Sequence, residues 1–290
     1  MQIEILKRAK KIGYVFSGGS ARCAFQIGAI ELLAELGIEP AVCAGASMGA
    51  WNAAILAAGI RERIRFYWQS FVRMPPIDLR NLLVEHSPFR YRVMHERTFR
   101  RFVGERLHAP EALPLLISLT RLRDRTNVIF DARQFEDPLR LLLATSYFFP
   151  LFTHAPMIDG HHYGDGGVTD NAPYERVFAE GCDAVVIFSQ KGESEGGLFK
   201  RIGDVDHEIP EALRDRVVVI RPRHRMPVSF TEQRWSRLAP IADLGYLRSR
   251  EVLLGERHPE TDLRARGKAP SAYITALVRG VRRVVPPGMR

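Results

Sequence analysis

Apolar runs of strand length alternate with helical patterns in the first part of the chain. Residues 12–16 form one such run, and a polar, glycine-rich turn follows at residues 17–20. The next stretch places apolar residues on one helical face: Ala24, Ile27, Ile30, Leu33 and Leu36. A second apolar run at residues 40–44 leads into another helical stretch. This order of strand, helix, strand and helix predicts the start of a doubly wound α/β sheet.

The rest of the chain continues the α/β pattern. Runs of β-branched and apolar residues predict further strands at residues 113–120, 126–130, 157–158, 162–163, 183–188 and 217–220. Helices are predicted at residues 138–144, 173–179, 238–254 and 271–284. Residues 61–109 look mainly helical, and we expect them to cover one side of the sheet or to act as a lid. The polar, glycine-rich stretch at residues 191–210 is typical of a mobile loop.

Composition changes this picture little. The chain has 290 residues, 46% hydrophobic and 26% charged, which is ordinary for a globular protein that buries a large core. Residues 41–60 carry no charge and approach membrane-spanning length. Their alanine and glycine content favours a buried strand, a turn and a buried helix, so we predict no transmembrane segment.

Cysteine usage indicates a reduced, cytoplasmic setting. Cys23, Cys43 and Cys182 cannot form a disulfide framework and lack metal-ligand spacing. The N-terminus lacks the apolar core of a signal peptide. His161 and His162 are adjacent on a predicted strand and so point to opposite faces. We therefore expect surface or packing roles for them, and neither a metal nor another cofactor.

The chain is basic, with a net charge of +9, and 36 of its 42 basic residues are arginine. Arginine binds phosphate in bidentate geometry, so anionic lipid headgroups and nucleic acid are conceivable partners. A solvated basic surface is the simpler interpretation. Because no nucleic-acid-binding signature accompanies the charge, we expect no nucleic acid partner; peripheral contact with an anionic membrane stays open.

The sequence Gly45-Ala46-Ser47-Met48-Gly49 has the G-x-S-x-G spacing of a nucleophile elbow. In such a strand-to-helix turn the positions two before and two after the serine must be small, because larger side chains would collide. The serine is strained, exposed, and placed at a helix N-terminus that favours developing negative charge. The alternative is a plain turn that caps a buried helix.

A second glycine-rich turn, Gly18-Gly19-Ser20, follows the first strand. It can direct main-chain N–H groups at a point near Ser47 and so form an oxyanion hole. The competing interpretation is a dinucleotide-binding loop. It fails in detail because G-x-G-x-x-G is not formed, and the chain has no Walker sequence.

The base for Ser47 decides the mechanism. One candidate is Asp165, followed by Gly166 and Gly167, because a carboxylate in a glycine-dense loop suits close approach to another loop. Alone, this sequence is also a common surface hairpin. A Ser-His-Asp arrangement stays open, since six histidines lie downstream: His154, His161, His162, His207, His224 and His258.

Taken together and in this order, residues 18–22, 45–49 and 165–167 resemble the patatin-like phospholipase family. Residues 144–152 and 171–173 are similar to the family's sequence around the aspartate, and the resemblance covers roughly residues 12–189. It implies a three-layer α/β/α fold with a mostly parallel central sheet. It also implies a Ser–Asp dyad that hydrolyses acyl esters of lipids without a catalytic histidine.

The resemblance assigns roles by position. Ser47 is the expected nucleophile and Asp165 the base, with the pKa of the carboxyl raised by desolvation from Phe148, Phe149 and their neighbours. Gly18, Gly19 and Ser20 are the expected oxyanion donors, and Arg22 lies near the next helix start. The family usually has glycine where this chain has Ser20 and Cys23. We expect Ser20 to donate if its φ allows, and Cys23 to narrow the cleft.

The resemblance also sets the expected domains and function. Residues 1–225 are expected to form the catalytic domain, and residues 226–290 a helical, arginine-rich C-terminal extension packed on it. The expected function is a serine lipid acyl hydrolase of the phospholipase A or lysophospholipase type, acting on a lipid or acyl-ester substrate. The alternatives are a catalytically weak membrane- or protein-binding module and a conventional Ser-His-Asp esterase.

Overall fold

A computed structural model describes residues 2–149, 151–195, 199–201 and 204–262. Within these residues the centre is an eight-stranded sheet of order β10-β7-β1-β2-β3-β6-β5, with β4 paired to β3. Its strands are β1 (Ile12–Phe16), β2 (Val42–Gly45), β3 (Leu115–Arg121), β4 (Thr126–Asp131), β5 (Met157–Ile158), β6 (His161–Asp165), β7 (Ala184–Phe188) and β10 (Val217–Ile220). Strands β10 to β3 run parallel, and β4, β5 and β6 add antiparallel pairs at one end.

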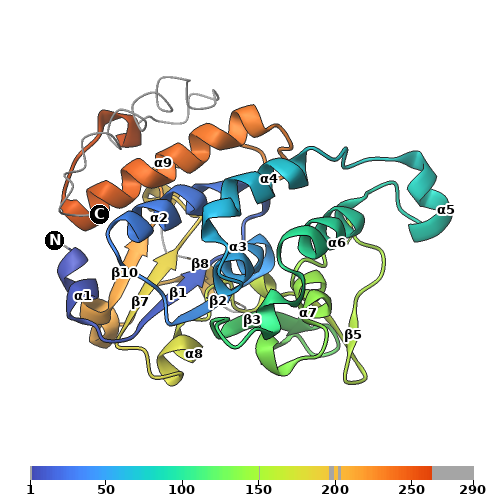
Figure 1. Cartoon of the computed structure of the whole chain (residues 1–290), viewed down its shortest axis with the longest axis horizontal. Coiled ribbons are helices and arrows are strands. Elements are labelled where there is room, and N and C mark those ends of the chain that lie inside the picture. The colour runs from blue at the N-terminus through green and yellow to red at the C-terminus, as the bar shows by residue number, and fades with distance from the viewer. Residues whose placement is uncertain (1, 150, 196–198, 202–203, 263–290) are drawn as a thin grey trace.

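Helices cover both faces of the sheet, and the alternation of side chains along each strand feeds two separate cores. On β1, Tyr14 and Phe16 belong to the larger core, whereas Val15 belongs to the smaller one on the other face. Parallel strands buried on both faces are apolar at every position, as β1 is. The larger core lies under α2 (Ala24–Glu35), α3 (Ser47–Ala57) and α9 (Trp235–Leu254), and α8 (Tyr174–Ala179) covers the opposite face (Figure 1).

The remaining helices are α1 (Ile3–Arg8), α4 (Ile64–Val72), α5 (Leu82–Glu85), α6 (Tyr91–Phe102) and α7 (Pro138–Thr145). Helices α4 and α6 pack beside α3, and α5 lies at the end of an arm that projects from the body (Figure 1). The helical prediction for residues 61–109 is therefore confirmed, including the break after α4 at Pro75.

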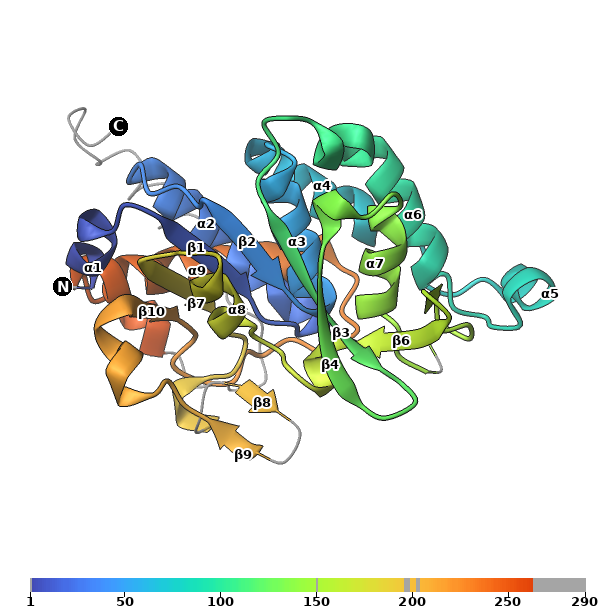
Figure 2. The same cartoon turned by 90° about the horizontal axis from the view of Figure 1, so that it is seen from below.

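The predicted fold class is confirmed, and two local expectations need comment. Residues 191–210 were expected to be a loop, but they contain a hairpin of β8 (Phe199–Arg201) and β9 (Asp204–His207) (Figure 2). Backbone pairing between the two short strands overrides a polar composition that indicates no strand. The predicted helix at residues 271–284 lies outside the described residues. Among the described residues, no helix is both long enough and apolar enough to cross a bilayer.

Helix α9 packs directly on α2, and two glycines make this contact possible. A Cβ on Gly245 would lie 1.8 Å from the carbonyl oxygen of Phe25, and one on Gly28 would lie 1.9 Å from that of Ala242. Both distances are far inside van der Waals contact. Backbone therefore meets backbone at this crossing, and any side chain would force the helices apart.

We expect Gly245→Ala to destabilise the protein by about 2–3 kcal/mol, because the added methyl overpacks the crossing. The direction of the stability change is diagnostic. Alanine has a higher helix propensity than glycine, so it would stabilise the helix at a position with free space around it. Denaturant unfolding measures the change. Ser236→Ala, at an exposed position of the same helix, is the control and should shift stability by less than about 0.5 kcal/mol. Stabilisation by Gly245→Ala would contradict the close crossing.

Candidate active site

Strand β3 brings two loops that are distant in sequence to one place. Its residues 116–121 pair with β4 along one edge, so β2 and β6 share the other edge. On that shared edge Gly45 pairs with Ile117, and Asp165 pairs with Leu119. Two residues of a strand span about 7 Å. The chain after β2 and the chain at the end of β6 therefore converge.

Ser47 lies in the sharp turn that the spacing predicted. Strand β2 ends at Gly45, α3 begins at Ser47, and the φ angle of Ser47 is +51°. This left-handed conformation is strained for a residue with a side chain. A Cβ on Gly49 would lie 2.3 Å from the carbonyl oxygen of Phe16, so only glycine fits between the elbow and β1. At Gly45 a Cβ would lie 2.9 Å from the nitrogen of Ala50.

The Ser47 hydroxyl lies close enough to the carboxylate of Asp165 to favour its ionised form. Burial raises the pKa of Asp165 from 3.8 to about 6, although the Ser47 hydroxyl and the hydrogen bond from the N–H of Gly167 (2.7 Å) oppose the shift. This rise by desolvation agrees with the expectation. Phe148 lines the same pocket as Asp165 although it is 52% exposed, whereas Phe149 is 69% exposed and does not line the pocket. The loop itself is tight: a Cβ on Gly166 would lie 2.0 Å from the carbonyl oxygen of Ser118.

The glycine-rich turn after β1 lies beside Ser47, but its three main-chain N–H groups differ in whether they are already hydrogen-bonded. The N–H of Gly18 donates to Oδ1 of Asn171 at 2.7 Å. The expectation that Gly18 is an oxyanion donor is therefore wrong, because its N–H is already paired. Within the described chain, the N–H groups of Gly19 and Ser20 have no acceptor. Ser20 has a φ of +51°, so it adopts the conformation that glycine would adopt more easily.

Arg22 and Cys23 lie just beyond this turn and outside the pocket. Arg22 lies two residues before α2, near the helix start as expected, and its Nε is buried without a hydrogen-bond partner. Cys23 is fully buried and its thiol donates to the carbonyl of Ser17 at 3.5 Å. The expectation that Cys23 narrows the cleft is wrong, because its side chain points into the core and does not line the pocket.

Ser47 and Asp165 open into a narrow, mainly apolar pocket of about 50 Å³. Helices α4 and α6 supply one wall, and the segment after α7 supplies another. These walls comprise Trp68, Phe71, Val72, Tyr91, His95, Ser146, Phe148, Leu151 and Phe152. A volume of this size holds one or two water molecules. A larger ligand therefore enters only when side chains of the lining, such as the half-exposed Phe148, move aside.

A segment far downstream closes the pocket, and sequence reasoning missed it. Phe230, Glu232 and Gln233 line the pocket, and the carbonyl of Phe230 accepts the N–H of Ala21 at 3.2 Å. Hydrogen bonds from Arg234 hold the pKa of Glu232 down at about 2, so this buried carboxylate is ionised. No motif marks these residues. Their position depends on tertiary contacts such as the hydrogen bond between Ala21 and Phe230, which no local sequence pattern indicates.

The Thr145 hydroxyl fixes the elbow from the opposite side. It accepts the N–H of Ser47 at 2.8 Å and donates to the carbonyl of Ser118 at 2.8 Å. Ser118 in turn donates to the carbonyl of Asp170. One hydroxyl at the end of α7 therefore connects the nucleophile turn to the strand that positions Asp165. Sequence analysis placed Thr145 in a matching block without assigning it this role.

His95 is the histidine that lines the pocket among the described residues. Its ring is fully enclosed, stacks on Trp51 at 4.3 Å between centroids, and leaves Nδ1 unpaired. Burial lowers the pKa of His95 to about 3, so the ring is neutral at ordinary pH. Of the downstream histidines considered for a triad, His161 and His162 are exposed, and His154, His224 and His258 also do not line the pocket.

Comparison with known proteins identifies the family. The family model described as patatin-like phospholipase matches residues 14–178, more than half of the chain. The chain therefore belongs to the patatin-like phospholipase family. Its membership of this family supports a lipid hydrolase activity. No curated protein matches the sequence.

Similar solved structures include VipD from Legionella pneumophila, with a TM-score of 0.49 and 14% identity over 95% of this chain and 75% of that one. The type III effector protein ExoU has a TM-score of 0.42 and 15% identity, over 84% of this chain and 52% of that one. The chain thus spans about half the length of ExoU.

We expect Thr145→Val to cost about 1–3 kcal/mol of stability, because it leaves the N–H of Ser47 and the carbonyl of Ser118 without their partner. It should also lower kcat by loosening the turn that holds the nucleophile. Thr145→Ser keeps the hydroxyl and is the matched control, and it should recover most of both losses. Unfolding free energies and ester hydrolysis rates measure the two effects. Equal behaviour of the valine and serine variants would contradict this role.

Proposed function

We propose that this protein is a serine lipid acyl hydrolase in which Ser47 is the nucleophile and Asp165 the general base. The observation that carries the proposal is that Ser47 and Asp165 line the same apolar pocket, with the hydroxyl close enough to the carboxylate to favour its ionised form. A serine becomes nucleophilic when a neighbouring base can accept its proton. Burial brings the pKa of Asp165 to about 6, closer to the neutral range in which a general base works well.

The chemistry follows from the positions of the groups. Asp165 accepts the proton of Ser47, and Oγ attacks the ester carbonyl carbon to form a tetrahedral oxyanion. The N–H groups of Gly19 and Ser20 and the N-terminus of α3 stabilise that charge. The alcohol leaves with the proton from Asp165, and an acyl-enzyme remains. Water then gives its proton to Asp165 and attacks the acyl carbon, which releases the carboxylic acid and restores Ser47.

We further propose that residues 1–225 form the catalytic domain and that residues 226–290 form an extension of the same domain. Two observations support this division. Helix α9 packs on α2 at the crossing of Gly28 and Gly245, and residues 230–233 line the pocket. The extension would then help determine which acyl chains are accepted, because Phe230 and Gln233 lie opposite the helical wall.

Ser47→Ala should abolish hydrolysis of p-nitrophenyl esters and of phospholipid, because it removes the nucleophile. It should also abolish covalent labelling by a fluorophosphonate. Ser20→Ala is the matched control: it lines the same pocket and has the same φ angle, and it keeps its main-chain N–H. Its labelling should persist. A labelled Ser47→Ala protein would refute the assignment, and vesicle binding without labelling of the wild type would favour a binding module.

Asp165→Asn should abolish turnover, and the wild-type kcat/KM should rise with pH through an apparent pKa of about 6. The rise is expected because only the ionised carboxylate accepts the proton of Ser47. An active Asp165→Asn enzyme would instead favour a histidine base. Because His95 titrates near 3, it cannot produce a transition in activity near pH 6.

Asp165→Asn should also stabilise the protein, but only where the carboxyl is ionised. Its folded pKa, about 6, lies above its ordinary value of 3.8. Ionisation therefore destabilises the fold increasingly as the pH rises from about 4 through about 6. Above that range we expect the variant to gain on the order of 2 kcal/mol relative to wild type. Unfolding at several pH values measures this, and a gain that does not depend on pH would contradict it.

A further inference from the structure

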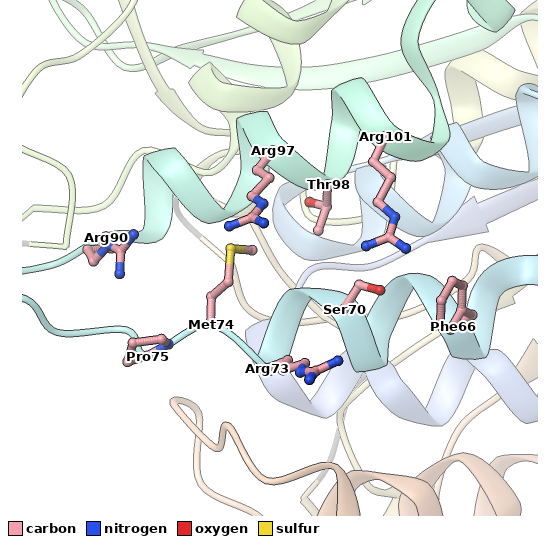
Figure 3. Close-up of a pocket in the computed structure, with 9 residues that line it drawn as sticks. All are labelled: Phe66, Ser70, Arg73, Met74, Pro75, Arg90, Arg97, Thr98 and Arg101. Atoms are coloured by element: carbon pink, nitrogen blue, oxygen red, sulfur yellow. The ribbon is translucent and has the colours of Figure 1, made fainter.

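A second cavity, of about 350 Å³, lies between α4 and α6 and is lined by four arginines (Figure 3). Arg97 and Arg101 extend from α6 toward α4, Arg73 caps the end of α4, and Arg90 precedes α6. The other residues of the lining are Phe66, Ser70, Met74, Pro75 and Thr98. No carboxylate is among them. The cavity therefore combines high positive charge with partly apolar walls.

Most of this positive charge has no acidic partner. Arg90 lies 3.7 Å from Asp78, and Arg101 lies over the rings of Phe66 and Phe102 at 5.4 Å. Within the described chain, Arg73 and Arg97 form no ion pair. Four like charges around one cavity repel each other unless an anion lies between them. Guanidinium groups match a phosphate group best, because they can bind it in bidentate geometry.

An apolar arm extends from the rim of this cavity (Figure 1). Pro75 and Arg90 line the cavity and also begin and end the arm. Hydrogen bonds from the N–H of Asp78 to Pro88 and from that of Arg90 to Pro76 hold its two sides together. The large apolar side chains exposed on it are Ile77, Leu79, Leu82 and Leu83, and Leu83 is 88% exposed. An internally braced segment that exposes leucines fits insertion among lipid acyl chains.

We propose that the arginine cavity and the apolar arm together dock the protein on a bilayer that contains phosphomonoester lipids, with phosphatidic acid as the probe. The arginines bind the headgroup phosphate, and the leucines enter the lipid layer. A polynucleotide would use the charge but would leave the leucines in water, so the apolar arm favours a membrane. The proposal is independent of the chemistry at Ser47.

This docking surface would also orient the active site. Helix α4 supplies Phe66 and Arg73 to the arginine cavity and Trp68 and Phe71 to the catalytic pocket. Helix α6 likewise contributes to both, through Arg97 on one side and His95 on the other. The same pair of helices thus forms a wall of each site. Docking through the arginines brings the wall of the catalytic pocket to the lipid surface.

The test is flotation of a Ser47→Ala protein with vesicles, so that lipid is not consumed and failed docking is not confused with failed hydrolysis. Three compositions are compared: phosphatidylcholine alone, phosphatidylcholine with phosphatidylserine, and phosphatidylcholine with phosphatidic acid at matched surface charge. We expect the strongest binding to phosphatidic acid. Arg97→Gln with Arg101→Gln should weaken it about thirtyfold. Leu79→Ser with Leu83→Ser should also release the protein.

The matched control is Arg100→Gln with Arg106→Gln, which removes the same charge from exposed arginines outside the cavity. It should keep the preference for phosphatidic acid, and the melting temperatures of all variants verify that they are folded. Three results would overturn the proposal. They are equal binding to both anionic vesicles, equal losses in the cavity and control variants, and binding to a duplex oligonucleotide without binding to vesicles.

Discussion

The site depends on one edge of one strand. Strand β3 pairs with β4 along one edge, over residues 116–121. Strands β2 and β6 therefore both pair with its other edge, at different positions. Because β2 ends opposite Ile117, the edge is vacant from Leu119 onward, and β6 pairs there in the antiparallel direction. Serine and acid thus meet through main-chain hydrogen bonds at two neighbouring positions. Long-range pairing positions them more firmly than contacts between flexible loops would.

Close backbone contact maintains this convergence. Gly49 lies against the carbonyl of Phe16 and Gly166 against that of Ser118, with no room for a side chain at either position. The Asn171 side chain accepts the N–H of Gly18 and donates to its carbonyl, so it connects the loop of Asp165 to the glycine-rich turn after β1. The precise placement of these groups requires backbone strain at two serines and burial of a carboxyl group. Ser20 and Ser47 have positive φ angles, and Asp165 carries a carboxyl whose ionisation burial opposes.

The sequence was sufficient to predict the central parallel strands, because residues that are apolar on both faces leave few alternatives. The runs at residues 12–16 and 217–220 are the observed β1 and β10. The motifs also located the elbow and the acid. The antiparallel pairing of β6 with β3 was not predictable, since it depends on where β2 ends in space. The same holds for the paired N–H of Gly18, the burial of Cys23 and the contribution of residues 230–233, which are all consequences of tertiary contacts.

Helices α4 and α6 each contribute to two cavities, and this arrangement has a thermodynamic consequence. Trp68 on α4 and Arg73, the residue that follows its end, are five residues apart and so lie on different faces, one facing the narrow pocket and the other facing the basic cavity. A molecule that prefers one spacing of these helices changes the affinity of the other cavity for its own ligand. Linkage requires the reverse effect to be equal in free energy. An anion bound in the basic cavity and a ligand bound in the narrow pocket would therefore act as mutual effectors whenever both prefer the same spacing.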